Sequence, residues 1–132
     1  MANWYGQSRS NYFKVKNASA FKAWANALHR QVWSDGDELF ALADNSEGFW
    51  PHERWDEEAE EGIDCDFGVE LQGHLADGEV AILMTTGAEK LRYLTGYAVA
   101  LNADGRRLDV NLDNIYDKVR AEFGVHPTQV SY

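Results

Sequence analysis

Residues 79–112 constrain the fold most, because their apolar residues recur at the spacing of strands joined by tight turns. Residues 79–84 predict a buried strand, and residues 90–101 predict a longer strand with alternate side chains on one face. Asn102-Ala103-Asp104-Gly105 predicts a turn, with glycine placed for a positive φ, and residues 106–112 predict a third strand. Consecutive strands joined by short connections predict an antiparallel sheet.

Three apolar stripes at helical spacing predict three helices. The first stripe comprises Phe21, Trp24, Ala25 and Leu28. The second comprises Ile63, Phe67, Leu71 and Leu75. The third comprises Leu112, Ile115, Tyr116, Val119 and Phe123. Asn17 is expected to cap the first helix, Asp64 or Asp66 the second, and Asp113 and Gly124 delimit the third. We expect Phe21, Trp24, Ile115 and Val119 to be buried.

The remaining strands complete an α+β fold. Residues 10–16 alternate like a strand, and residues 31–33 and 38–43 predict a hairpin. Residues 87–89 are expected to form a connection, and the tail over 126–132 a short edge strand. The predicted order is β-α-β-β-α-β-β-β-α, an antiparallel sheet of about five to six strands with three helices covering one face.

The chain of 132 residues is expected to form a single domain over 1–132. Residues 44–62 have no clean hydrophobic period, and we expect them to form a long, irregular acidic loop. Long loops inside compact domains are uncommon and are often functional. The loop is therefore the first place to look for a site.

Charge is unevenly distributed along the chain. Residues 1–34 carry five bases and no acid, whereas residues 35–70 carry fourteen acids and one base, Arg54. The formal net charge of the whole chain is -10. Such a surface suits a basic partner and disfavours direct binding to nucleic acid, whose phosphates require a basic face. The alternatives are that the acids only keep the protein in solution, or that they balance the basic N-terminal third.

The candidate partner-binding residues lie in this acidic segment. Eight are carboxylates that can occupy positions where a nuclease expects phosphates: Glu53, Asp56, Glu57, Glu58, Glu60, Glu61, Asp64 and Asp66. Trp50 and Trp55 are candidate apolar anchors, because tryptophan is enriched at interface hot spots. The alternative is a solvated loop whose tryptophans fold back into the core.

The sequence predicts no catalytic site, no metal site and no cofactor. The four histidines have no metal-ligand spacing, and the single cysteine, Cys65, excludes a cysteine-based zinc cluster or an internal disulfide. The acidic run does not follow the spacing of a calcium-binding loop. A small enzyme that uses acid pairs near His52 remains an alternative.

The N-terminus lacks the basic start and apolar stretch of a secretory signal, and no apolar run approaches the ~18 residues of a membrane span. We therefore expect a cytoplasmic protein of a bacterial host cell, with no membrane partner.

Two regions resemble a type of small acidic protein carried on phages and plasmids. They are residues 10–16 followed by Ala20-Phe21-Lys22-Ala23-Trp24, and residues 89–98. The resemblance implies a setting on a mobile element, where short acidic proteins often counter host defence as antirestriction and anti-CRISPR proteins do. Several such inhibitors resemble DNA in charge and block a basic nucleic-acid channel.

Together these features predict a non-enzymatic inhibitor that acts as a DNA mimic. Its partner would be the basic surface of a nuclease or CRISPR effector complex. Two alternatives stay open: an immunity protein that neutralises a toxin nuclease, and the acid-lined enzyme. A structural module that forms a homodimer through exposed aromatic side chains is a further alternative.

Overall fold

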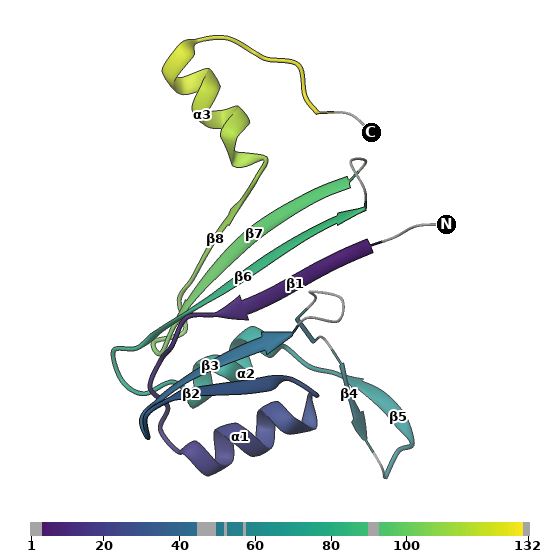
Figure 1. The fold of residues 1–132 in the computed structure, drawn as a ribbon, viewed down its shortest axis with the longest axis vertical. Helices are drawn as coiled ribbons and strands as arrows, with labels where there is room; N and C mark the ends of the chain where they lie inside the picture. Colours follow the sequence, from purple (N-terminus) through teal and green to yellow (C-terminus); the bar gives the residue numbers. More distant parts are fainter. Residues whose placement is uncertain (1–3, 45–49, 52, 57, 90–92, 131–132) are drawn as a thin grey trace.

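The computed structural model describes residues 4–44, 50–51, 53–56, 58–89 and 93–130, and it is an α+β fold (Figure 1). The helices are α1 (Ala18–Ala27), α2 (Phe67–His74) and α3 (Asn114–Phe123). The strands are β1 (Trp4–Ser10), β2 (Gln31–Asp35), β3 (Leu39–Asp44), β4 (Glu53–Asp56), β5 (Glu61–Asp64), β6 (Val80–Glu89), β7 (Tyr93–Asn102) and β8 (Arg107–Asn111).

Six strands form one antiparallel sheet in the order β2-β3-β1-β6-β7-β8. The predicted fold class, strand number and three helices are confirmed, and the order of elements matches apart from one extra hairpin, β4–β5. The turns expected after β2 and β7 are present, with Gly36 and Gly105 at φ of 74° and 90°. Glycine adopts such angles without the steric cost that a Cβ imposes.

The core lies between one face of the sheet and the helices α1 and α2. Helix α1 begins where Asn17 accepts a hydrogen bond from the Ala20 N–H at 2.9 Å, as predicted. Its apolar stripe buries Phe21, Ala25 and Leu28, and Trp24 is half-buried against the same cluster. From the sheet, the paired residues Leu83 and Val99 complete this layer, as do Ala81 and Leu101.

Strand β1 differs from the predicted first strand over 10–16. It covers Trp4–Ser10 and forms a central strand between β3 and β6. Phe13 and Val15 make only isolated bridges, to Phe40 and Leu75, although Phe13 is buried in the core and Val15 packs against it. The strand Trp-Tyr-Gly-Gln-Ser-Arg-Ser has no alternation of apolar and polar residues, because its buried side carries the small residues Gly6, Ser8 and Ser10.

Two other element boundaries differ from those predicted from the sequence. Residues 87–89 do not form a connection: they extend β6 and pair with Tyr93, Leu94 and Thr95 of β7. Ile63 lies in β5, so α2 begins only at Phe67, capped by Asp66. The tail forms no strand over the described residues 124–130.

The third helix has the predicted ends but not the predicted burial. It follows Asp113 and ends at Gly124, whose φ is 70°. None of its residues is buried: Ile115 is 55% exposed and Val119 is half-buried, so the expectation that both lie in the core is wrong. Figure 1 shows the reason, because α3 continues beyond the end of β8, away from α1 and α2.

Candidate functional site

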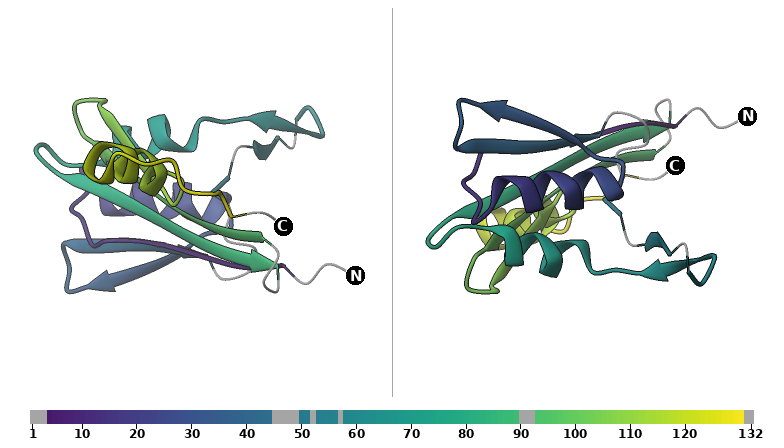
Figure 2. Two further views of the ribbon diagram at one scale, coloured as in Figure 1. Left: turned by 90° about the horizontal axis from the view of Figure 1, so that it is seen from above. Right: turned by 90° about the horizontal axis from the view of Figure 1, so that it is seen from below.

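The acidic segment folds into a hairpin. Within the irregular loop predicted over 44–62, residues 53–56 form β4 and residues 61–62 begin β5, which pairs antiparallel with β4, so that the prediction is wrong for these residues. The hairpin extends away from the sheet and helices in all views (Figures 1 and 2). The sequence does not predict this strand pair, because neither strand alternates apolar with polar residues.

The register of the hairpin places acids opposite acids. Glu53 pairs with Asp64, and Asp56 pairs with Glu61. Like charges directly opposite each other in an antiparallel pair are destabilising. The cross-strand pairing of these acids therefore adds no electrostatic stabilisation to the hairpin.

The candidate residues are distributed as follows. Glu58, Glu60, Glu61 and Asp64 are exposed near the tip and along β5, and Glu60 adopts a positive φ of 52° in the turn. Glu53, Trp55 and Asp56 belong to β4, with Trp55 opposite Gly62. Glu57 lies outside the described residues.

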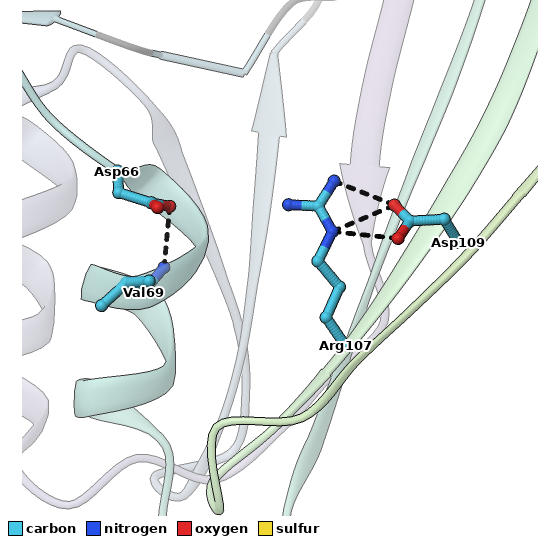
Figure 3. Close-up of polar contacts among 4 residues, drawn as sticks. All are labelled: Asp66, Val69, Arg107 and Asp109. Carbon is cyan, nitrogen blue, oxygen red and sulfur yellow. Dashed lines mark hydrogen bonds and ion pairs between the residues drawn. The ribbon is translucent and has the colours of Figure 1, made fainter.

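Asp66 lies where the hairpin joins α2, and it caps that helix. Its Oδ1 accepts a hydrogen bond from the Val69 N–H at 3.1 Å (Figure 3). A capping carboxylate is also stabilised by the partial positive charge of a helix N-terminus. Asp66 therefore has a structural role in the fold.

Trp50 also has a structural role, because its ring joins an aromatic stack. It lies against Phe67 with ring centroids 5.3 Å apart, and Phe67 stacks on Trp24 at 5.1 Å. The Trp50 indole Nε1–H donates to the buried Thr85 Oγ1 at 2.9 Å. Trp50 is half-buried and ties the segment before β4 to the sheet, so it is not an exposed interface anchor.

The bases of the N-terminal third have partners outside the hairpin. Lys14 Nζ lies 3.8 Å from the Glu38 carboxylate, Arg9 stacks 4.8 Å above Trp33, and Lys22 lies 5.2 Å from the Phe40 ring centroid. One of these partners, Glu38, belongs to residues 35–70, so the alternative in which the basic N-terminal third balances the acidic segment holds for this pair of side chains.

Sequence reasoning missed a polar pair near α2. The Arg107 guanidinium donates to both Asp109 oxygens at 2.9–3.1 Å, and these hydrogen bonds lower the pKa of the Asp109 carboxyl (Figure 3). Opposite charges two residues apart on a strand were the available signal, since such residues share a face. With Asp66, Cys65 and the Trp50 ring, Arg107 lines a cavity of about 330 Å³.

His74 is a second missed residue. Its ring lies 4.9 Å from Trp24 and 6.0 Å from Phe21, and this burial lowers the pKa of His74, partly offset by the Glu70 carboxylate. Among the described residues, no group of three or more His, Cys, Asp or Glu side chains is placed to hold a metal ion. In the same part of the chain, no helix has the length and apolar content to cross a membrane.

Comparison with protein-family models, with curated proteins and with solved structures found no match.

Proposed function

We propose that this protein is a non-enzymatic inhibitor that binds a basic groove of a nucleic-acid-handling defence complex through the β4–β5 hairpin. The observation that carries the proposal is the projecting hairpin whose register sets acid opposite acid. Within a monomer this arrangement is unfavourable. Against a basic groove the same carboxylates supply the charge pattern of a phosphate backbone.

The electrostatic argument makes the interaction selective. Residues 35–70 carry fourteen acids against Arg54 alone, so their field attracts a basic surface and repels DNA and RNA. Exposed charges are screened over ~10 Å at 0.1 M salt, so inhibition should weaken steeply as ionic strength rises. Trp55, in β4 opposite Gly62, is the candidate for the apolar contact that slows dissociation.

The test uses two variants with the same change in net charge. The hairpin variant carries Glu58→Gln, Glu60→Gln, Glu61→Gln and Asp64→Asn. The control variant carries Asp77→Asn, Asp104→Asn, Asp113→Asn and Glu122→Gln, all at exposed positions outside residues 35–70. Each immobilised protein captures partners from a bacterial lysate, and mass spectrometry identifies them.

We expect the wild type and the control variant to capture a nucleic-acid-binding partner that the hairpin variant loses. Added duplex DNA should displace that partner, and the wild type should inhibit its DNA cleavage. A partner captured equally by the hairpin variant, or one with an acidic contact surface, contradicts charge mimicry. A captured toxin nuclease would instead identify an immunity protein.

A stability measurement keeps this test interpretable. Because the register sets acid opposite acid, the hairpin variant should melt at the same temperature as the wild type or higher. A clear loss of stability would mean that the carboxylates have structural partners, and the proposal would lose its main support.

A further inference from the structure

The second surface without a partner is helix α3, and it lies at the opposite end of the molecule from the hairpin (Figure 1). Its apolar stripe remains in water: Ile115 is 55% exposed and Phe123 is 73% exposed. A helix of ten residues is marginal in isolation, and most helical stability in proteins comes from packing an apolar face. The stripe therefore indicates a contact that the monomer does not supply.

The sheet has an uncovered apolar face of its own. Directly paired residues share a face of an antiparallel sheet. Met84 pairs with Ala98, which pairs with Val110. These three residues lie on the face of the sheet opposite to the one that packs against α1 and α2. Met84 is 57% exposed, and Leu108 on the edge strand β8 is 71% exposed. We call this the open face.

Helix α3 does not cover the open face of its own chain. Leu112 lies directly over Gly96, where an added Cβ would meet its side chain at 3.2 Å, and Asp113 begins the helix immediately afterwards. The chain therefore enters α3 from a fixed point at the end of the sheet. A groove of about 500 Å³, lined by Leu112, Ile115, Tyr116 and other residues, remains open beside the helix.

We propose that the open face and α3 form the interface of a two-fold homodimer, in which α3 of each copy packs on the open face of the other. The two surfaces are both apolar and both belong to one chain. A two-fold axis buries both in a reciprocal contact, as isologous interfaces do. A second copy thus supplies what each surface lacks, with no further partner required.

The available area matches what such a dimer needs. Eight large side chains between 43% and 73% exposed lie on these surfaces: Val80, Met84, Leu94, Leu108, Val110, Leu112, Ile115 and Phe123. A fully exposed large apolar side chain has on the order of 100 Å² of surface. Scaled by their exposed fractions, these eight side chains therefore offer roughly 500 Å² of apolar area. A standard interface buries ~800 Å² per partner at ~60% apolar, which is also roughly 500 Å².

The experiment measures molar mass by sedimentation equilibrium and by light scattering after gel filtration, over a range of protein concentrations. The wild type is expected at twice the chain mass of 14.9 kDa. Phe123→Glu in α3 and Met84→Glu on the open face should each give a monomer. Val69→Glu is the matched control, because Val69 is 61% exposed on α2, away from both surfaces, and it should remain dimeric.

Two results would overturn the proposed interface between α3 and the open face. A wild type that is monomeric at every concentration would assign these surfaces to a different partner. A dimer that survives Met84→Glu but not Phe123→Glu would mean that α3 pairs with α3. Circular dichroism verifies the fold of each variant, and Leu108→Glu, on the exposed edge strand, replaces Met84→Glu should that variant unfold. The outcome is independent of the hairpin, so it cannot be confused with a failure of the proposed inhibition.

Discussion

The hydrogen bond between Trp50 and Thr85 fixes the segment that leads into the acidic hairpin, and Trp50→Phe isolates its contribution. Phenylalanine keeps an aromatic ring against Phe67 but removes the indole N–H, which donates to Thr85 Oγ1 at 2.9 Å. Thr85 is only 2% exposed, so water cannot easily replace the lost donor. Leaving a buried polar group unsatisfied costs about 1–3 kcal/mol, and we expect Trp50→Phe to destabilise the protein by that amount.

The double variant separates the hydrogen bond from the packing. Thr85→Val alone leaves an indole N–H that is only half-buried and can bind water, so a smaller loss of about 0.5–1.5 kcal/mol is expected. Trp50→Phe with Thr85→Val removes both polar groups. Its cost should fall below the sum of the single variants by about 1 kcal/mol, because residues that share a hydrogen bond are coupled.

Urea unfolding followed by far-UV circular dichroism measures these free energies without depending on tryptophan fluorescence. With a denaturant slope of about 1–3 kcal/mol/M, the expected loss for Trp50→Phe shifts the midpoint by roughly 1 M. Additivity of the two single variants to within about 0.3–0.5 kcal/mol would refute the reasoning. The indole would then not be bonded to Thr85 in solution.

Three further predictions concern the body of the fold. Phe21→Ala should destabilise the protein by about 3–5 kcal/mol in the same urea assay, because Phe21 is fully buried in the core. Burial lowers the pKa of His74, so the unfolded chain binds its proton more readily: stability should be full above about pH 6.5 and fall as the pH decreases below it, and His74→Gln should flatten this part of a plot of melting temperature against pH. Gly105→Ala should cost about 1–2 kcal/mol because its φ is 90°, whereas Gly73→Ala, inside α2 with open space around the added Cβ, should stabilise by up to ~1 kcal/mol in thermal melts.

The sequence by itself determined the elements whose cause is local. Asn17 caps α1 because its own side chain reaches the Ala20 N–H, and the stripe through Phe21 and Leu28 points to the core at helical spacing. Gly105 and Gly124 mark a turn and a helix end because both adopt a positive φ. These features depend on residues within a few positions of each other, so a pattern in the chain suffices to predict them.

The candidate site was predicted in part. Its place in the acidic segment followed from composition, but the hairpin did not, because β4 and β5 pair through their backbones and neither strand alternates apolar with polar residues. Trp50 and Asp66 belong to the same segment, but the structure gives them structural contacts, a hydrogen bond to Thr85 and a helix cap. No pattern along the chain separates these roles.

Only the tertiary structure decided which surfaces are covered. Strand β1 is polar yet central, because β3 and β6 satisfy its backbone on both sides. Helix α3 has the same apolar periodicity as α1, but its entry over Gly96 directs it away from the core. Amphipathic spacing states that a face should be buried. It does not state against what, because burial depends on where the rest of the chain, or a second chain, is placed.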